Sequence, residues 1–395
     1  MMSCSRASLA AAAAAALVTS AWAGDWPQWR GPQRNGISAE TDWQPKWGAG
    51  GPRKLWTAQL GAGYSAVAVS GGRVYSVGNA GNRDTVFCLD ANNGRVVWRQ
   101  SYPCRFGDMG GPRATPVLDG GRVYTMSEEA QAYCLNAGTG KVIWNRDLAR
   151  ETGAQRPQWG FAGSALIQGN LAIYNVGATG TALDKTSGQV VWKSGGRTGY
   201  ASPVAYKVGA QQAVALFAGT GLVAVNPVNG RQLWSFPWQT SYDVNAADPI
   251  FSFDKVFISS NYGKGCALLR VTGGRPEVVW QNREMKNHFN TCVLLAGSIY
   301  GNDENTLKCL DLSTGAERWR HRGGIGKGGL IASNGHLLVL TESGELLVIK
   351  ATPTAYTEVS RAKVMGGTCW THPVLANGRL YCRNSQGELV CLALK

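Results

Sequence analysis

The sequence predicts an all-β fold, namely an eight-bladed β-propeller made of four-stranded antiparallel blades. Tryptophans recur along the chain at spacings of 39 to 48 residues, which is the length of one propeller blade. Apolar and polar residues alternate with period two, as strands require, and 52 glycines suit the tight turns between short strands. The recurring tryptophans stand at positions 56, 98, 144, 192, 234, 280 and 319.

The first 23 residues have the features of a signal peptide. Arg6 precedes the apolar run Ala7–Val18, and Ala21-Trp22-Ala23 is a small-x-small cleavage site. The run is too short to span a bilayer as a helix, and no later stretch is long and apolar enough to do so. We therefore expect residues 1–23 to be removed near Ala23, leaving a soluble periplasmic or secreted protein without a transmembrane segment.

Residues 24–52 form an irregular arm that is rich in tryptophan, glycine and proline, and residues 53–395 form the propeller. In the first blade the expected strands are 66–69, 73–77, 85–89 and 95–99. The eighth blade begins at His372-Pro373-Val374 and ends at Leu394 without an outer strand. Residues 54–57 can supply that strand, which would close the ring and remove its exposed edge.

One motif occurs in five clear copies and explains how neighbouring blades pack. In the copy Ala182, Asp184, Gly188 and Trp192, the aspartate accepts hydrogen bonds from the turn and the glycine permits a positive φ. The tryptophan buries its ring against the next blade, and the small residue ten positions earlier leaves room for it. The copies begin at Cys88, Cys134, Ala182, Ala224 and Cys309.

The cysteines and the charges have ordinary structural explanations. Cys88, Cys134 and Cys309, with Cys391, occupy the small-residue position and are expected to be buried. Nine cysteines follow the signal peptide, which is an odd number, so at least one has no partner within the chain. Whether a disulfide forms that involves Cys104, Cys266, Cys292 or Cys369 is left open by the sequence. The formal charge of +14 is dispersed, which favours a solvated basic surface, and we expect no nucleic-acid partner.

The repeat resembles the tryptophan-docking motif of PQQ-type propellers, which runs Ala-x-Asp-x-x-Thr-Gly-x-x-x-Trp. Ala182, Asp184, Gly188 and Trp192 match it, with Ser187 in place of threonine, and the resemblance covers residues 53–395. The family includes quinoprotein alcohol dehydrogenases and the outer-membrane protein assembly factor BamB. The segments 26–32 and 369–373 are also similar to exported BamB-like propellers.

Alignment of the inner strands predicts a binding site at one mouth of the propeller. Six of the eight residues just before these strands are aromatic or basic, and most residues two positions later are small or polar. Such a mixture is typical of ligand pockets, although the same residues could instead plug the channel. An unknown protein or an anionic ligand is the expected partner. The candidate ligand-binding residues are Tyr64, Arg113, Thr115, Tyr200, Ser202, Asp248, Phe289, Lys327, Trp370 and His372.

Two classes of function compete, and the sequence favours an exported, non-catalytic binding or assembly scaffold. The alternative is a periplasmic PQQ-dependent oxidoreductase, in which PQQ with calcium would do the chemistry. The resemblance to those enzymes then implies an adjacent Cys-Cys pair, which this chain lacks. It also implies a carboxylate-rich calcium site. Asp108, Asp243 and Asp248 lie on suitable loops, but nothing in the sequence groups them as calcium ligands. No catalytic residue, metal ligand or cofactor is therefore expected. Cys4 precedes the apolar run, so it cannot carry the lipid anchor of an assembly factor.

Overall fold

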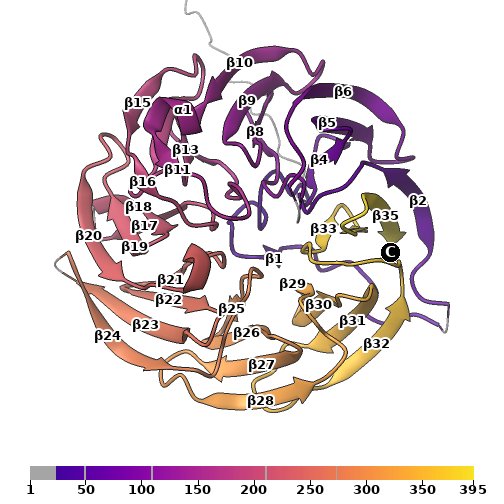
Figure 1. Ribbon diagram of the computed structural model, residues 1–395. Coiled ribbons are helices and arrows are strands. Elements are labelled where there is room, and N and C mark those ends of the chain that lie inside the picture. Colours follow the sequence, from indigo (N-terminus) through magenta and orange to yellow (C-terminus); the bar gives the residue numbers. More distant parts are fainter. Residues whose placement is uncertain (1–23, 49, 108–109, 210, 273) are drawn as a thin grey trace, which may run out of the picture.

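The computed structural model describes residues 24–395 except residues 49, 108–109, 210 and 273. The expected signal peptide lies outside these residues. Eight sheets of four antiparallel strands stand around a common axis, and one of them carries an added strand at its inner edge (Figure 1). The predicted eight-bladed propeller is therefore confirmed.

The blades follow one another in chain order, and each begins with its innermost strand. Blades 1 to 4 consist of β3 (Ala68–Ser70), β4 (Arg73–Ala80), β5 (Arg83–Asp90) and β6 (Val96–Pro103); β7 (Val117–Asp119), β8 (Arg122–Met126), β9 (Gln131–Asn136) and β10 (Val142–Asp147); β12 (Leu166–Gln168), β13 (Leu171–Tyr174), β14 (Thr181–Asp184) and β15 (Val190–Lys193); and β17 (Val204–Val208), β18 (Gln211–Ala218), β19 (Gly221–Val225) and β20 (Gln232–Pro237).

Blades 5 to 8 repeat the pattern, with the last outer strand taken from the start of the propeller. They consist of β21 (Ile250–Ser252), β22 (Lys255–Ser260), β23 (Gly265–Thr272) and β24 (Arg275–Asn282); β25 (Val293–Leu295), β26 (Ser298–Asp303), β27 (Thr306–Asp311) and β28 (Glu317–Arg322); β29 (Gly329–Ser333), β30 (His336–Leu340), β31 (Glu345–Lys350) and β32 (Glu358–Lys363); and β33 (Val374–Ala376), β34 (Arg379–Arg383), β35 (Glu388–Ala393) and β2 (Lys54–Gln59).

The ring is closed by β2, which pairs antiparallel with β35 as the outer strand of blade 8. Trp56 lies opposite Cys391 in this ladder, and its Nε1 donates a hydrogen bond of 3.0 Å to the carbonyl of Ala91 in blade 1. The two ends of the propeller sequence are thus held by backbone pairing and by a docked indole. The predicted closure is confirmed.

Other tryptophans of the motif dock in the same way, which explains why the spacing within the motif is constant from copy to copy. In the five clear copies the small residue lies opposite the tryptophan, as Cys88 does opposite Trp98, whereas Leu268 lies opposite Trp280 in the weaker copy. The indole covers the glycine of the next blade, so a Cβ on Gly188 would lie 2.7 Å from the Trp144 ring. The Nε1 atoms of Trp98, Trp144, Trp192, Trp280 and Trp319 donate to the carbonyls of Ala137, Lys185, Pro227, Leu312 and Thr352 at 2.8–3.1 Å.

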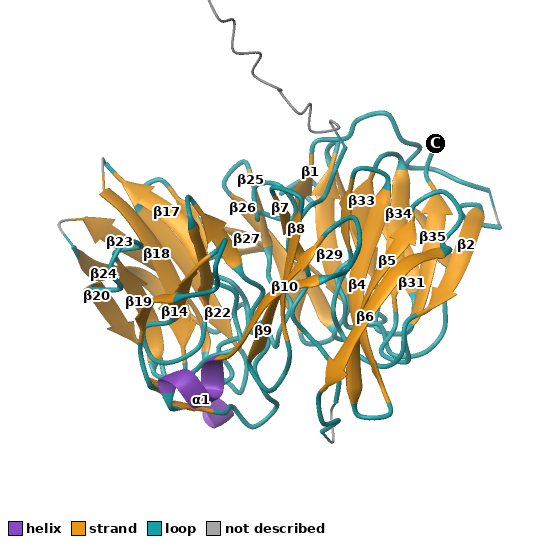
Figure 2. Cartoon of the chain, turned by 90° about the horizontal axis from the view of Figure 1, so that it is seen from above, coloured by secondary structure: helices purple, strands orange, loops and turns teal. Residues whose placement is uncertain are grey.

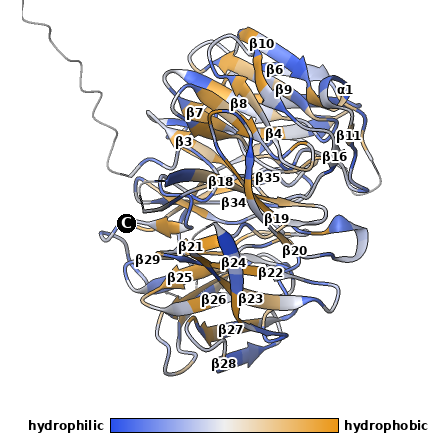
Figure 3. Cartoon of the chain, turned by 90° about the vertical axis from the view of Figure 1, so that its left-hand side faces the viewer, coloured by the Kyte–Doolittle hydropathy of each residue, from blue (hydrophilic) through white to orange (hydrophobic). Residues whose placement is uncertain are grey.

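The interior of each blade is apolar, whereas the outermost strands carry polar residues together with exposed apolar ones such as Val97 and Ile143. β28 is a largely polar example, of which Trp319 alone is buried (Figure 3). All nine cysteines of the described chain are buried and free, so none of the disulfides left open by the sequence forms. They act as small apolar residues beside the docked indoles and in the blade cores.

The arm crosses one face of the ring before β2. Its short strand β1 (Ile37–Ser38) pairs parallel with β29, and the Trp43 Nε1 donates to Ser333 Oγ at 3.0 Å. Blade 7 lacks a docking tryptophan. Ser360 stands at the corresponding position, and its hydroxyl donates to the arm carbonyl of Pro45 at 2.5 Å. The arm thus covers the outer part of blade 7 as well as the channel.

Loops between the blades carry the few remaining elements. Helix α1 (Leu148–Thr152) follows β10 and ends at Gly153 with a φ of 66°. It lies on the face opposite β1 (Figure 2). The same loops contain a parallel pair, β11 (Ala154–Gln155) with β16 (Gly196–Arg197), and a 3₁₀ turn over Ser241–Asp243. In the part of the chain that the structure describes, no helix is both long and apolar enough to cross a membrane.

Candidate functional site

A cavity of about 380 Å³ opens at the mouth of the propeller where the inner strands begin. Every blade contributes to its wall through the residue that precedes its inner strand. These residues come from eight separate loops, yet they share one position in the repeat. They are Tyr64, Arg113, Ala162, Tyr200, Ala246, Phe289, Lys327 and Trp370.

A continuous series of ring contacts surrounds the cavity, and we call it the aromatic collar; all its members except Tyr242 line the cavity. Tyr64 stacks on Trp370 with centroids 5.4 Å apart and an angle of 18° between the planes. The series then passes from Trp370 to Phe289 at 5.1 Å. It continues with centroid distances of 5.2–6.2 Å through His288, Tyr262, Tyr242, Trp159 and Tyr200.

Two cations lie against the stacked pair of the collar. The Arg113 guanidinium is 5.6 Å from the Tyr64 ring centroid, and the Lys327 ammonium is 5.3 Å from that of Trp370. Arg113 also pairs with the buried carboxylate of Glu128, which receives a second ion pair from Arg156. Burial lowers the pKa of Arg113, and Glu128 opposes this effect.

Glu342 holds both Trp370 and the backbone of Lys327. The indole Nε1 of Trp370 donates to Oε1 of Glu342 at 2.8 Å, and the Lys327 amide donates to Oε2 at 2.9 Å. One carboxylate therefore sets the position of a ring and of a neighbouring cation. A fixed ring loses little conformational entropy when it binds a ligand.

Below the collar, side-chain oxygens join one blade to the next in a belt of hydrogen bonds. The amide of Ala66 donates to Thr115 Oγ1, that of Thr115 to Ser164 Oγ, and that of Ser164 to Ser202 Oγ, at 2.8–3.2 Å. At the end of the series, the amide of Ser202 donates to Asp248 Oδ1, and the amide of Asp248 donates to Thr291 Oγ1. The first inner strand begins at Ala68 and not at the predicted Ala66, because the Ala66 amide belongs to this belt.

The structure separates the candidate residues into two groups. Ser202 and Asp248 line the cavity together with the candidates of the collar and its two cations, and Ser164, which was not a candidate, lines it as well. Thr115 and His372 lie outside its lining, although we expected them at the mouth. Thr115 accepts the Ala66 amide and donates its own amide to Ser164 within the belt. His372 packs edge-on against Trp29, with centroids 5.0 Å apart, and bonds to the Leu330 carbonyl.

The arm closes the floor of the cavity, which the sequence did not reveal. Trp29 lines the cavity and donates from Nε1 to Asp248 Oδ2 at 2.7 Å. Behind it, Arg30 donates to the carbonyls of Thr291 and Cys292 in blade 6 at 3.2 and 2.7 Å. Burial raises the pKa of Asp248, while the nearby Arg30 and Arg34 lower it. Asp248 therefore anchors the arm.

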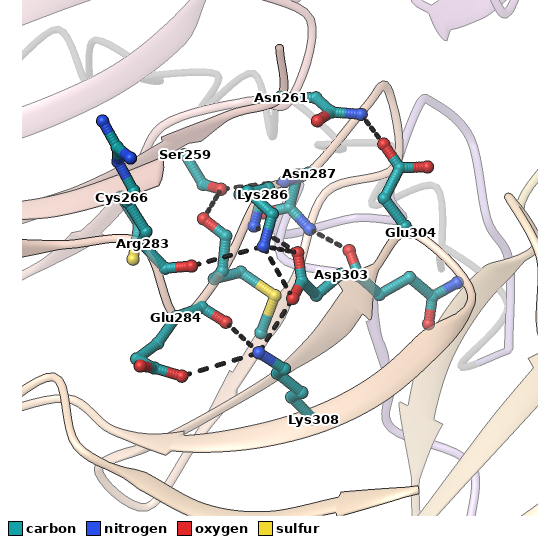
Figure 4. Close-up of polar contacts among 12 residues, drawn as sticks. Ser259, Asn261, Cys266, Arg283, Glu284, Lys286, Asn287, Asp303, Glu304 and Lys308 are labelled. Atoms are coloured by element: carbon teal, nitrogen blue, oxygen red, sulfur yellow. Dashed lines mark hydrogen bonds and ion pairs between the residues drawn. The ribbon is translucent and has the colours of Figure 1, made fainter. Parts of the chain in front are cut away.

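A dense polar cluster anchors the loop that carries His288 and Phe289 (Figure 4). Lys308 is 5% exposed, pairs with Asp303 at 2.8 Å and donates to the Glu284 carbonyl at 2.8 Å. Lys286 pairs with the same Asp303 at 2.7 Å. These bonds tie the loop to β26 and β27, so the collar rests on a rigid support on this side.

The residues at the mouth do not fit PQQ with calcium. A calcium ion needs several free oxygen ligands, above all carboxylates. Asp248 already accepts from Ser202 and Trp29, and Asp243 pairs with Arg197 at 2.9 Å. Asp108 lies outside the described residues. Within the described chain, no group of three or more acidic, histidine or cysteine side chains could hold a metal ion.

Several lining residues were not among the candidates because they lie in loops outside the repeat or, for Asn290, between the two repeat positions that were considered. Trp159, Tyr262, His288 and Asn290 belong to connections whose shape is set by tertiary contacts. The sequence feature that could have identified them is an aromatic or polar residue in a loop at the mouth end of a blade. Burial, and the nearby Lys327, lower the pKa of His288, which favours its neutral form.

Known structures share this architecture over most of their length. BamB from Moraxella catarrhalis aligns with a TM-score of 0.67 and 18% identity, covering 87% of this chain and 99% of that chain. Quinohemoprotein alcohol dehydrogenase from Comamonas testosteroni aligns with a TM-score of 0.68 and 13% identity, covering 94% and 80%. The enzyme ADHIIG of the same class from Pseudomonas putida HK5 aligns with a TM-score of 0.67 and 13% identity, covering 94% and 80%. At these identities the likeness shows the fold alone.

The sequence comparisons agree with the repeat. A search of curated protein sequences finds no match to the chain. The family model described as "Outer membrane protein assembly factor BamB" matches residues 42–109 and 104–321, which is more than half of the chain. Together with the docking tryptophans and the eight blades, this match shows that the chain belongs to the BamB-like family of PQQ-type repeat propellers.

Proposed function

We propose that the protein is an exported, non-catalytic binding scaffold that holds a ligand or a partner protein in the cavity at its mouth. The aromatic collar carries this proposal, because loops of several blades together present large rings around one open cavity. Aromatic side chains with adjacent cations are enriched where proteins bind partners. A stability role alone would not require rings around an open cavity. The fold family and the sequence of the first 23 residues support a periplasmic or secreted location.

The supports behind the collar favour binding over catalysis. The carboxylates of Glu128, Asp248 and Glu342 accept hydrogen bonds from the chain itself, so they orient other residues. A general acid or base needs access to the substrate and a pKa suited to the reaction. The quinoprotein alternative is supported by the fold of its dehydrogenase neighbours, but the oxygen ligands at the mouth do not fit it.

The test replaces Trp370 and Arg113 separately by alanine and measures both affinity and melting temperature. The partner is first recovered from the exported fraction on immobilised wild-type protein. Loss of a binding anchor such as Trp370 is expected to cost about 2 kcal/mol of binding free energy or more. We expect Arg113→Ala to weaken binding as well.

Trp319→Ala is the matched control. Trp319 is 8% exposed and docks between blades away from the cavity, so its loss should lower the melting temperature and leave affinity unchanged. If Trp370→Ala lowers only the melting temperature, the collar is packing and the proposal fails. Addition of PQQ and calcium to the wild-type protein should give no reduction of an artificial electron acceptor by alcohols. Turnover that requires both would favour the oxidoreductase instead.

A further inference from the structure

A carboxylate oxygen of the arm is buried without a hydrogen-bond donor. Glu40 reaches blade 8, where its Oε2 accepts the backbone amide of Gly378 at 2.6 Å. Its Oε1 is also buried, but it has no hydrogen-bond partner among the residues that the structure describes. Most buried polar atoms of folded proteins have a partner, so this oxygen indicates that a donor belongs beside it.

The start of the described chain, Gly24, lies directly beside this oxygen. A Cβ on Gly24 would lie 2.9 Å from Glu40 Oε1 and 2.7 Å from Asn377 Oδ1, and both of these atoms are hydrogen-bond acceptors. Asn377 is held with its oxygen on this side, because its Nδ2 donates to Asp25 Oδ1 at 3.2 Å. The position next to Gly24 therefore suits a donor and not a side chain.

Removal of the signal peptide would place a donor there. The sequence predicts cleavage after Ala23, in which a signal peptidase adds water across the peptide bond to Gly24. The departing peptide then ends in a carboxylate, and the proton that its acid releases is taken up by the new amine of Gly24 at neutral pH. The product is an ammonium with three donors and one positive charge.

This ammonium can reach both acceptors by rotation about one bond. In the uncleaved chain the nitrogen of Gly24 is tied to the preceding residue, so its direction is fixed. Once that tie is cut, rotation about the Cα–C bond can carry the nitrogen to the place of the Cβ, since single bonds at Cα differ little in length. There it would lie close to 2.9 Å from Glu40 Oε1 and 2.7 Å from Asn377 Oδ1, which are ordinary hydrogen-bond distances.

The charges near this pocket also favour a cation. The arm brings the carboxylates of Asp25, Glu40 and Asp42 to this part of blade 8, where Lys395 pairs with Asp42 at 2.8 Å. Burial raises the pKa of Glu40, two backbone amides of blade 8 and Lys395 lower it, and Asp42 raises it further. An ammonium on Oε1 would add the positive charge that the three carboxylates lack.

We propose that the ammonium of the mature N-terminus binds between Glu40 and Asn377 and so locks the arm onto the propeller. This inference rests on the export in the proposed function and adds a maturation step to it. The bond to Glu40 joins opposite charges, which makes it stronger than a neutral hydrogen bond.

The lock lies at the head of the segment that builds the cavity floor. Asp25 accepts two bonds of 3.0 Å from the turn between β3 and β4 of blade 1. Trp26 exchanges two backbone bonds of 2.8 Å with Val69, and Trp29 then forms the floor. The ammonium at blade 8 therefore fixes the arm where it crosses to blade 1, and cleavage completes the support of the cavity.

The experiment compares the exported protein with a variant in which one serine is inserted between Ala23 and Gly24. Mass spectrometry of the two N-termini checks that the first begins with Gly24 and the second with the serine. The insertion moves the ammonium away by one residue and keeps every side chain of the fold. We expect amides of residues 24–31 to exchange hydrogen at least tenfold faster in the variant, because a bond between charged groups is lost, whereas residues 310–319 should keep their rates.

Glu40→Gln tests the assigned acceptor, and Asp42→Asn is its control. Asp42 is a neighbouring acid of the arm, but its carboxylate is exposed and pairs with Lys395. Glu40→Gln should speed exchange over residues 24–31 about tenfold, and the serine insertion should add nothing further in that background. Asp42→Asn should keep the wild-type rate. Effects of the insertion and of Glu40→Gln that add, or a mature chain that does not begin with Gly24, would overturn the inference.

The pH dependence separates an ion pair from packing alone. Pairing raises the pKa of the α-amine above its ordinary value of about 8, so its contribution is complete below pH 8 and is lost as the pH rises through the raised pKa. The unfolding equilibrium constant of the wild type, divided by that of Glu40→Gln, should rise about tenfold between about pH 8 and 10, and a constant ratio would contradict the pairing. If these tests fail while Trp370→Ala still weakens partner binding, the maturation step is wrong and the proposed function stands.

Discussion

His372 shows at the scale of one residue how burial sets a charge state. It is 5% exposed, and its Nδ1 donates to the Leu330 carbonyl at 3.1 Å. Its Nε2 is buried without a partner among the described residues, so the ring is held as the neutral tautomer. Burial, with the nearby Arg30, lowers the pKa of His372 to about 3.

This pKa predicts a loss of stability in acid. The unfolded chain binds a proton at His372 near the ordinary pKa of about 6.5, whereas the folded chain does not bind it until about 3. Its contribution to the free energy of unfolding is therefore complete above pH 6.5 and is lost as the pH falls toward 3, by up to about 5 kcal/mol. His372→Asn keeps a donor for the Leu330 carbonyl but cannot take up a proton. The pH dependence of its unfolding free energy, measured with urea between pH 4 and 7, should be shallower than that of the wild type.

His336→Asn provides the comparison for this experiment. His336 also bonds to a backbone carbonyl through Nδ1, that of Asn334 at 2.7 Å, but near the surface. His336→Asn therefore controls for the loss of a histidine and of an Nδ1 bond to a carbonyl without changing the buried site of His372. A His372→Asn curve parallel to the wild type would show that another group causes the acid sensitivity.

Within one blade, the glycine of the repeat has two separate constraints. Gly188 has a φ of 73°, and an added Cβ would meet the Trp144 ring at 2.7 Å. Gly169 has a φ of 57°, and a Cβ there would meet nothing within 4 Å. We expect Gly169→Ala to cost about 1 kcal/mol of unfolding free energy through backbone strain, and Gly188→Ala about 3 kcal/mol because the indole must also shift.

A double-mutant cycle separates the two constraints. In a Trp144→Ala background the indole is gone, so Gly188→Ala should cost no more than Gly169→Ala. Unfolding free energies from urea titrations give all the values. An equal cost of the two glycine substitutions in the wild-type background would mean that the docked indole moves without penalty.

For the whole molecule, ring closure depends on one strand far in sequence from its partner. We consider a variant in which residues 54–60 are replaced by a glycine-serine linker of the same length. The linker keeps the arm tethered to the propeller, but it removes the pairing of β2 with β35 and the docking of Trp56. The edge of β35 is then exposed, and such edges associate with other chains. Light scattering after size exclusion should detect oligomers, and the thermal transition should broaden.

Trp319→Ala is again the useful comparison, because it removes one docked indole without opening the ring. It should melt at a lower temperature and stay monomeric if the wild type is monomeric. A segment-replaced protein with the oligomeric state and melting curve of the wild type would show that the ring does not depend on β2.

The sequence was sufficient to predict the structure of the parts of the molecule that repeat. Each blade encodes its own hairpins, and the offset of ten residues from Ala182 to Trp192 sets a ladder in which these residues face each other. Because the register is local, the residue before each inner strand could be identified, and these eight residues line one cavity. That they bind a ligand stays a prediction.

The floor and much of the collar depend on contacts that do not repeat. Trp29 reaches Asp248 across 219 residues of sequence, and no periodicity indicates that the arm enters the channel. Trp159 and Tyr262 lie in loops whose paths are set by packing against other loops. Asp248 has the same position in the repeat as Ser202, yet its role as the arm's anchor follows from its burial beside Arg30 and Arg34. Local pattern therefore specifies the blades, and long-range packing specifies what the mouth can hold.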